Sequence, residues 1–558
     1  MVHSDNLDDW FPRDAAVTFA GMRLGVVVGG SLSKGLEVKL DRATQIEDLA
    51  VGRYVVVRGA RKRFFCMVTD ITLDTTNPAI KSDPPNLDDP FLREIYSGTA
   101  AFGTIQVTPM LTIDEEGDIL PVKTIPSHFM PVEVATVDDV EDVFGHEDET
   151  HFNVGAPLEL EETQINLDLR RLVERSIGVF GKSGTGKSFL TRVIMAGIIQ
   201  RDVAVNLIFD MHNDYGWEVS DERGTAVKGL KQLFQSKVVI FTLDAESSHR
   251  RNAKFDHIVE MGYEEIEPAD LAMLKATMDL SDSMIDAAYS FEKRFGRNWI
   301  LTFLDMLEHQ PDDLEEIVHS SSMNWGSVQA LARRLKRFER FGFLKAHTVE
   351  DSVKRVMHMI EQRKSVVLEF GRYGSSLEAY ILVANYLTRR IHEYYVQQVE
   401  RSLGDKSQMP PQLLITIEEA HKFLDPLIAR QTIFGIIARE LRKYNVTLLI
   451  VDQRPSAIDE EVMSQVGTRV TALLDNDKDI AAVLMGVSGA GSLREVLARL
   501  ETKQQAIIMG HAVPMPVVMK PRTYDADFYA SLEYLPGTEK PKRNGKQRLG
   551  SDKGDRRL

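Results

Sequence analysis

The sequence has few features of a membrane-spanning or secreted protein. Its single cysteine, Cys66, cannot form an internal disulfide, and its apolar neighbours predict a core position. The absence of any run of roughly 18 or more apolar residues predicts that there is no transmembrane helix. Residues 1–10 are acidic and polar, unlike a secretory signal. We therefore expect a cytoplasmic protein.

Positive charge is also scarce, since the net charge is −16. This argues against a surface coated with cations for nucleic acid, although a ring-shaped protein needs basic groups only along its channel. The scattered histidines and the lone cysteine argue against a structural zinc site. At 558 residues the chain is too long for one core, so we expect two or three domains.

The first third of the chain contains short β-rich runs separated by turn residues. Their spacing predicts a small antiparallel β-barrel. We place this barrel and a linker at 1–155. The acidic stretch 137–150 is interpreted as a linker or exposed helix with a solvated face. The predicted strands lie at 25–28, 36–40, 54–57, 64–68 and 103–107.

From residue 176 onward, buried apolar strands alternate with helices, which is typical of an α/β fold with a mostly parallel sheet. We expect this core over 156–535, with a helical insertion at about 245–345. Residues 536–558 form a predicted disordered basic tail, which either contacts nucleic acid or only aids solubility. The predicted core strands lie at 177–180, 205–209, 238–241, 366–369, 413–417 and 447–451.

One segment has the spacing of a phosphate-binding loop between a predicted strand and a predicted helix. Its glycines let backbone N–H groups point at phosphates, and the following helix adds the positive end of its dipole. Lys187 would reach the β- and γ-phosphates of ATP, and Ser188 would hold Mg²⁺. The predicted nucleotide-binding residues are Gly181, Lys182, Ser183, Gly184, Thr185, Gly186, Lys187, Ser188 and Phe189.

Two carboxylates, Glu418 and Glu419, directly follow a predicted buried strand. The carboxyl ends of parallel strands are where ligands bind in open α/β sheets. Hydrolysis needs a group that orients a water molecule and an acid that helps to hold the metal. We therefore assign Glu419 to the attacking water and Glu418 to Mg²⁺ or its water shell. The sequence predicts an ATPase.

The order and spacing of these motifs resemble the HerA family of hexameric DNA translocase and helicase ATPases, within the HerA/FtsK superfamily. The resemblance covers nearly all of 176–520 and implies a RecA-like P-loop core, preceded by a HAS-barrel-like domain. The segments that carry it, besides the phosphate-binding loop, are 209–215, 418–421, 439–444 and 451–455.

The resemblance also implies roles for residues beyond the two acids. Gln453 would act as a sensor of the γ-phosphate or attacking water; the alternative is that its amide only caps a strand. An arginine would reach the nucleotide of a neighbouring subunit, with Arg442 as first choice and Arg439 as second. The alternative is that both are surface arginines of a helix.

This sequence departs from the family pattern at two positions. Glu418 stands where Asp is usual, which alters the metal geometry or leaves the contact to a bridging water. Asp214 stands where Glu is common, so its role is open. We interpret His421 as a hydrogen-bonding partner of nearby backbone, and His212 as a link between the nucleotide site and neighbouring loops.

The implied function is ATP-dependent translocation on double-stranded DNA by a homo-hexamer. A separate nuclease or effector chain (NurA-like, Sir2-like or another nuclease) is implied as partner, in DNA end processing or anti-phage defence. The sequence itself shows no nuclease constellation of acids. Two alternatives stay open: an ATP-switched ring scaffold that activates an effector, and a peripheral conjugation or secretion ATPase.

Overall fold

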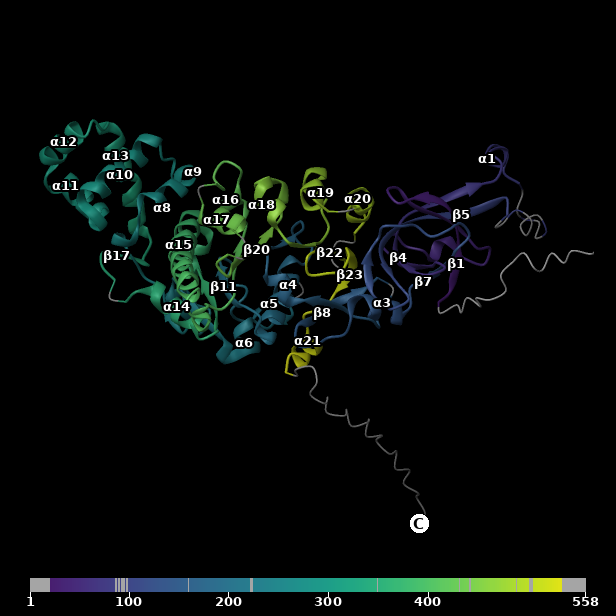
Figure 1. Cartoon of the computed structure of the whole chain (residues 1–558). Coiled ribbons are helices and arrows are strands. Elements are labelled where there is room, and N and C mark those ends of the chain that lie inside the picture. Colours follow the sequence, from purple (N-terminus) through teal and green to yellow (C-terminus); the bar gives the residue numbers. More distant parts are fainter. Residues whose placement is uncertain are drawn as a thin grey trace, which may run out of the picture.

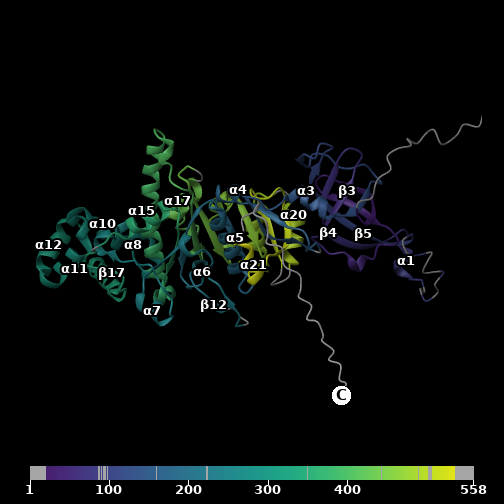
Figure 2. The same ribbon diagram turned by 90° about the horizontal axis from the view of Figure 1, so that it is seen from below.

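The computed structural model describes residues 21–85, 88, 91, 96, 99–158, 160–220, 224–348, 350–430, 432–440, 443–487, 489–500 and 505–533. The predicted tail at 536–558 and the predicted trans-acting Arg442 lie outside these residues. Figures 1 and 2 show an elongated molecule with a barrel at one end, a helical lobe at the other and a sheet between them. Within the described ranges, no helix is long and apolar enough to cross a membrane.

The N-terminal barrel closes on itself, as the spacing of its short strands predicts. Its strands run in the order β2-β1-β7-β3-β4-β5, all antiparallel, and β5 pairs back with β2. Apolar side chains fill the interior, including the predicted core residue Cys66. The elements are β1 (Arg23–Ser31), β2 (Gly35–Leu40), η2 (Ile46–Asp48), β3 (Tyr54–Arg58), β4 (Arg63–Thr75), α1 (Ala79–Ser82), β5 (Ala101–Ile113), β6 (Ile119–Pro121) and β7 (Pro131–Val134).

The acidic stretch after the barrel forms helix α3 (Val137–Phe144), which Thr136 caps. Asp138 is exposed as predicted, but Asp139 is only 2% exposed. The Arg63 guanidinium donates to the Asp139 carboxylate at 2.9 Å, and Arg58 lies 3.6 Å away. The prediction of a wholly solvated acidic face is therefore wrong at Asp139, because two barrel arginines use it as a buried counter-charge.

The core is built on a mixed sheet in which 12 strands of the described chain take part. Every core strand predicted from the sequence is present. The parallel part runs β14-β18-β11-β19-β20-β10-β21, and β22, β23, β8 and β9 continue it antiparallel. The strands are β8 (His151–Pro157), β9 (Ile165–Asp168), β10 (Ile177–Phe180), β11 (Val205–Asp210), β14 (Val238–Thr242), β15 (His257–Ile258), β18 (Ser365–Glu369), β19 (Leu413–Glu418), β20 (Val446–Asp452), β21 (Thr468–Thr471), β22 (Ala506–Gly510) and β23 (Val517–Pro521).

Strand β8 spans the predicted boundary between residues 155 and 156, so the core sheet begins a few residues earlier than the expected domain limit. Tyr54 of the barrel is 1% exposed, and its hydroxyl accepts a hydrogen bond from the Val518 backbone N–H at 2.8 Å. Arg499 of the core lies 3.9 Å from Asp70 of the barrel. The barrel is thus joined to the sheet by the chain and by direct contacts.

Helices and short segments complete the core around the sheet. Helix α5 follows β10, and its residues 190–200 are all buried, which fits its largely apolar sequence. The helices are α4 (Leu169–Val173), α5 (Lys187–Arg201), α6 (Leu230–Phe234), α14 (Ser352–Glu361), α15 (Leu377–Ser402), α16 (His421–Leu424), α17 (Ile433–Glu440), α18 (Glu460–Gln465), α19 (Asp477–Leu484), α20 (Ala490–Ala498) and α21 (Ala526–Ser531). The short elements are β12 (Val219–Ser220), β13 (Ala226–Val227), η3 (Gln235–Lys237), η7 (Gly371–Ser375), η8 (Lys406–Gln408) and η9 (Pro455–Ala457).

The predicted helical insertion lies between β14 and β18 and forms the helical lobe, α8 to α13. Phe291 stacks on Phe303 in its core with ring centroids 4.5 Å apart. Asp270 of the lobe is buried and receives hydrogen bonds from Arg389 and Asn385 of α15, both at 2.9 Å. The elements are α7 (Ala245–Arg250), β16 (Met261–Gly262), η4 (Tyr263–Glu265), α8 (Pro268–Met273), α9 (Lys275–Met278), α10 (Asp282–Phe295), η5 (Gly296–Asn298), α11 (Trp299–His309), α12 (Pro311–Ser320), α13 (Trp325–Leu335), η6 (Lys336–Arg340) and β17 (Leu344–Lys345).

Candidate active site

The phosphate-binding loop connects β10 to α5 and holds its lysine inside the turn. Gly181, Gly184 and Gly186 have φ angles of 153°, 77° and 90°, which glycine adopts without strain. The Lys187 ammonium donates a hydrogen bond to the Lys182 carbonyl across the loop, at 2.9 Å. The loop therefore already surrounds the Lys187 side chain. A bound phosphate would replace the Lys182 carbonyl as the partner of the Lys187 ammonium.

The last predicted nucleotide-binding residues, Lys187, Ser188 and Phe189, form the first turn of α5. The first backbone N–H groups of a helix have no partner within it, so this turn is suited to an anion. The Thr185 hydroxyl donates to the Lys182 carbonyl at 2.8 Å and braces the loop from inside. The loop and first turn thus bring the predicted nucleotide ligands to one place.

Three carboxylates lie around Lys187. Burial lowers the pKa of Lys187, and the negative charges of Glu419, Asp452 and Glu418 oppose that shift. Such charges act on a side chain only from close by. The predicted catalytic base Glu419 and the predicted metal ligand Glu418 therefore both lie near the phosphate-binding lysine.

Four neighbouring strands of the sheet end in an acidic residue. Glu369 ends β18, Asp210 ends β11, Glu418 ends β19 and Asp452 ends β20. None of the four is more than 9% exposed. Buried carboxylates are costly unless they meet donors or cations, so this edge of the sheet is a candidate functional site.

Glu418 has one satisfied oxygen and one free oxygen. The Tyr215 hydroxyl donates to its Oε1 at 2.8 Å, whereas its buried Oε2 has no hydrogen-bond partner among the described residues. Burial and the nearby charge of Asp210 raise the pKa of Glu418 to about 8. A hard cation with oxygen ligands would satisfy the free oxygen, so Glu418 fits its predicted role at Mg²⁺.

Asp210, at the end of the motif strand β11, supports Glu418 indirectly. Asp210 accepts hydrogen bonds from the backbone N–H groups of Asp214 and Tyr215, both at 2.8 Å. Burial raises the pKa of Asp210 to about 7. Asp210 thereby fixes the backbone that carries the Tyr215 hydroxyl to Glu418.

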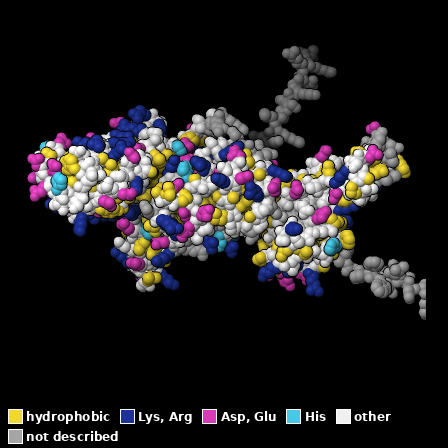
Figure 3. Space-filling model, turned by 90° about the horizontal axis from the view of Figure 1, so that it is seen from above, with side chains coloured by type: hydrophobic (Ala, Val, Ile, Leu, Met, Phe, Trp, Pro, Cys, Tyr) yellow, Lys and Arg dark blue, Asp and Glu magenta, His cyan; other side chains and the backbone are white. Residues whose placement is uncertain are grey.

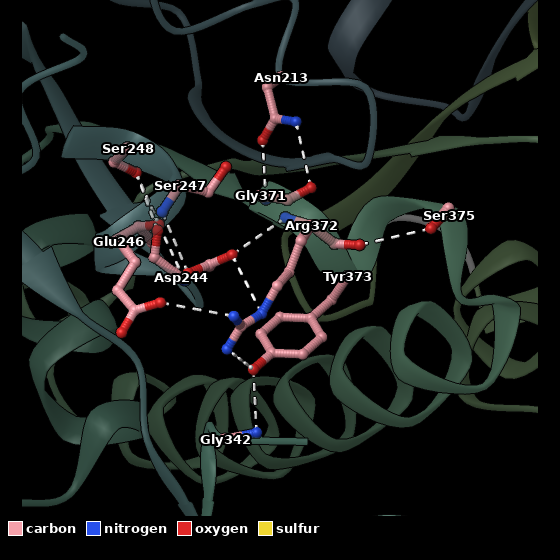
Figure 4. Close-up of polar contacts among 11 residues, drawn as sticks. Asn213, Asp244, Glu246, Ser247, Ser248, Gly342, Gly371, Arg372, Tyr373 and Ser375 are labelled. Carbon is pink, nitrogen blue, oxygen red and sulfur yellow. Dashed lines mark hydrogen bonds and ion pairs between the residues drawn. The ribbon is translucent and has the colours of Figure 1, made fainter. Parts of the chain in front are cut away.

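The loop after β11 also contacts the loop after β18. The Asn213 side chain accepts from the Gly371 backbone N–H at 2.9 Å and donates to the Gly371 carbonyl at 3.5 Å (Figure 4). His212 was the predicted link between the nucleotide site and neighbouring loops, but its side chain is exposed. Asn213, which has a left-handed φ of 58°, makes the contact instead.

Glu419 is held by groups from two other motifs. Its φ is 48°, a left-handed conformation that is uncommon for glutamate and typical of strained functional sites. The Gln453 amide donates to its Oε1 at 3.1 Å, and His421 lies 3.7 Å from its Oε2. His421 was expected to bond nearby backbone, but its Nδ1 instead lies 2.9 Å from the Asp452 carboxylate. The predicted sensor, Gln453, is thus hydrogen-bonded directly to the predicted catalytic base, Glu419.

The sequence matches family models over both of its main parts. Residues 152–391 match the model described as the central domain of helicase HerA, and residues 24–122 match the HAS barrel domain. The chain is 24% identical over 511 residues to the DNA double-strand break repair helicase HerA of Sulfurisphaera tokodaii, covering 89% of this chain and 92% of that protein. The chain is thus similar to the HerA family over both its barrel and its core.

Other comparisons give further similar proteins. The chain is 24% identical over 408 residues to the HerA repair helicase of Pyrococcus furiosus, covering 66% of this chain and 68% of that protein. The solved structure of VirB4 of Thermoanaerobacter pseudethanolicus aligns with a TM-score of 0.44 and 13% identity, covering 69% of this chain and 99% of that one. As in the family, the nucleotide site is that of an ATPase.

Arg439, the second candidate for the trans-acting arginine, makes its contacts within its own chain. Arg439 lies near the end of α17, where its guanidinium donates to the Ala429 carbonyl at 3.2 Å and lies 4.0 Å from Glu461. Its side chain is 21% exposed. Arg442 lies outside the described residues. Arg439 is therefore anchored within its own chain.

Sequence reasoning missed three residues of this site. Asp452 carries the same signal as Glu418, an acid that closes an otherwise apolar strand. Tyr215 is part of the motif segment that follows β11. Arg192 is a charged residue within an apolar helix, and it donates to the Asp214 carbonyl at 2.5 Å while its guanidinium lies 5.8 Å from the Tyr215 ring centroid. A lone charge in such a helix signals a buried polar role.

Proposed function

We propose that this protein is an ATP-dependent translocase on double-stranded DNA that works as a homo-hexameric ring. The observation that carries the proposal is the convergence of Lys187, Glu418 and Glu419 at the carboxyl edge of the sheet. The names of its relatives, DNA double-strand break repair helicases, support DNA as the substrate. ATP is the proposed fuel.

The residues divide the work of hydrolysis. Lys187 binds the β- and γ-phosphates, and the glycine-rich turn surrounds them with backbone N–H groups. Ser188 and Glu418 would hold Mg²⁺, which would neutralise phosphate charge. Glu419 orients the attacking water and accepts its proton, while Gln453, bonded to Glu419, transmits the state of the nucleotide to β20.

The site is completed in the ring by an arginine from the next subunit. A guanidinium at the γ-phosphate stabilises charge in the transition state. Arg439 is bonded to the Ala429 carbonyl of its own chain, which favours Arg442 as the trans-acting residue. A hexamer follows the family pattern, and every interface between subunits would then contain one nucleotide site.

A separate nuclease or effector chain is the proposed partner, NurA-like, Sir2-like or of another nuclease type, in DNA end processing or anti-phage defence. Within the described ranges, no group of three or more histidine, cysteine or acidic residues is arranged to hold a metal ion. The barrel lies at the end of the molecule away from the helical lobe (Figure 1) and offers a collar for such a partner.

Steady-state ATPase assays with and without linear duplex DNA test the proposal. We expect DNA to stimulate turnover at least several-fold, and Glu419→Gln to abolish turnover while it retains binding of a fluorescent ATP analogue. A wild-type protein whose turnover is negligible with or without DNA, but which still activates a nuclease, would be an ATP-switched scaffold. Co-purification with membrane subunits would favour a conjugation or secretion ATPase.

A further inference from the structure

Cations are concentrated on one short segment of the helical lobe. In a chain of net charge −16, residues 333–340 contain Arg333, Arg334, Lys336, Arg337 and Arg340, with Glu339 as their acidic neighbour. The segment covers the end of α13 and all of η6. Figure 3 shows Lys and Arg side chains gathered on the upper face of the molecule, toward the end that carries the lobe.

Two arginines of this region lie on adjoining aromatic rings. The Arg340 guanidinium is 4.8 Å from the centroid of Phe341, and that of Arg372 is 5.1 Å from the centroid of Tyr373. The two rings themselves meet edge to face at 6.0 Å. The Tyr373 hydroxyl accepts hydrogen bonds from Gly342 at 2.9 Å and Arg372 at 3.0 Å (Figure 4). Stacking holds both guanidinium planes in fixed orientations. The Arg372 guanidinium also lies 3.4 Å from Asp244 and 3.5 Å from Glu246, and these carboxylates offset its charge (Figure 4).

A carboxylate positions two of the arginines without using up their donors. Arg337 and Arg340 each approach a different oxygen of Glu378, both at 3.1 Å. Each guanidinium has five N–H donors in a planar fork, so most of them stay available. Planar forks of this kind match the oxygens of a phosphate group.

Two further cations, Arg333 and Lys336, are not needed to attach the helical lobe to the core. Arg333 is exposed and makes no ion pair or hydrogen bond with the part of the chain that the structure describes. Lys336 is exposed too, and it lies 3.8 Å from Glu308 in a weak surface contact. Arg337 and Arg340 suffice to tie η6 to α15. An unpaired and a weakly paired exposed cation beside positioned arginines fit a polyanion better than they fit a structural role.

The same region is connected to the nucleotide site. The Asn213 side chain, in the loop after the motif strand β11, makes two hydrogen bonds with the backbone of Gly371. Arg372 is the next residue along the chain. A Cβ at Gly374 would lie 1.9 Å from the Met211 carbonyl oxygen, so the two loops are packed backbone to backbone. The loop after β11 is thus in direct contact with the loop that carries Arg372.

We propose that Arg333, Lys336, Arg337 and Arg340, which lie beside the η7 loop, form a phosphate-binding surface for the backbone of duplex DNA, which we name the η6–η7 surface. The proposal rests on the DNA translocase function proposed above and locates part of its DNA path on the helical lobe. Guanidinium forks and ammonium groups contact phosphates regardless of base sequence. The contact between Asn213 and Gly371 links DNA binding at this surface to the nucleotide site.

Fluorescence anisotropy of a labelled blunt 30-base-pair duplex, titrated with the full-length protein at several salt concentrations, tests the surface. The variant Arg333→Glu/Lys336→Glu changes two exposed side chains that the fold does not need. We expect a loss of affinity of roughly 10-fold, and a fall of about 2 in the slope of log K against log salt. Its melting temperature should stay within about 2 °C of the wild type.

The matched control is Lys293→Glu/Arg294→Glu, which makes the same charge change on exposed positions of α10. We expect the control to keep wild-type affinity within about twofold. Equal losses in both double variants, or an unchanged affinity and salt slope in Arg333→Glu/Lys336→Glu, would overturn the η6–η7 surface and leave the translocase proposal standing. A wild-type protein that binds no duplex at any salt concentration would overturn both.

Discussion

Glu419 depends on neighbouring side chains that have no catalytic chemistry of their own. Its left-handed backbone costs of the order of 1–3 kcal/mol, which the surrounding structure must offset. Asp452 contributes to this support because it accepts from the backbone N–H of His421 and of Arg454, both at 2.7 Å, besides the His421 ring. The position of the catalytic carboxylate is thus fixed from β20 as well as from β19.

Replacement of Asp452 tests this support. Asp452→Asn removes the charge that holds the His421 ring, so Glu419 loses its fixed orientation. We expect kcat for ATP to fall roughly 10- to 100-fold while KM changes by less than about threefold. Steady-state ATPase assays measure both. Glu460→Gln on α18 removes an exposed charge as a control, and equal kcat values for the two variants would contradict the support by Asp452.

Tyr215 acts on the metal side of the same site. Tyr215→Phe deletes the hydroxyl that donates to Glu418 Oε1 at 2.8 Å and leaves a second oxygen of this buried acid without a donor. We expect the Mg²⁺ concentration for half-maximal ATPase activity to rise roughly 10-fold. A Mg²⁺ titration of both proteins measures it. An unchanged Mg²⁺ requirement would show that Glu418 needs no orientation by Tyr215.

At the level of elements, local patterns in the sequence predicted most of the fold. Apolar runs bounded by turn residues predicted the barrel and core strands, and the glycine spacing predicted the phosphate-binding loop between β10 and α5. The contacts of Asp452 with His421 and of Tyr215 with Glu418 could not be predicted, because they join residues 31 and 203 positions apart. Only the order and register of the strands brings such residues together.

Helix α3 shows the same limit of local sequence patterns, since its buried acid, Asp139, was predicted to be solvated. Asp139→Ala leaves Arg58 and Arg63 without their shared buried carboxylate. We expect the free energy of unfolding to fall by about 3 kcal/mol. Urea denaturation followed by tryptophan fluorescence and circular dichroism measures the loss. The exposed neighbour gives the control, because Asp138→Ala should change stability by less than about 0.5 kcal/mol, and equal effects would contradict the assigned role of Asp139.

For the whole molecule, the proposed ring makes each nucleotide site the joint product of two chains. Lys187 and Glu419 would come from one subunit and an arginine from the next. The described chain has its site at the carboxyl edge of the sheet, between the barrel at one end and the helical lobe at the other (Figure 2). Neighbouring copies in a ring would therefore meet along the core.

Mixing of two inactive variants tests the shared site. Lys187→Ala and Arg442→Ala should each abolish turnover in homogeneous rings. Mixed rings contain interfaces in which an intact Lys187 meets an intact Arg442, about a quarter of all sites for random equal mixing. We expect ATPase activity to reappear in that proportion, together with a hexamer mass by native mass spectrometry. A mixture that stays inactive would show that Arg442 does not act in trans, and Arg439→Ala in its place tests the second candidate.

The pairing of β23 with β8 has a consequence for how the protein is made. These strands lie at 517–521 and 151–157, so the ribosome has synthesised almost the entire chain before the sheet can close. Until then β8 exposes an unpaired edge and the barrel lacks its Val518 contact with Tyr54. A chain truncated by premature termination would keep its phosphate-binding loop but lack a finished sheet. Cellular quality control would therefore recognise such fragments as incompletely folded, aggregation-prone proteins before they could assemble into a ring and inactivate it.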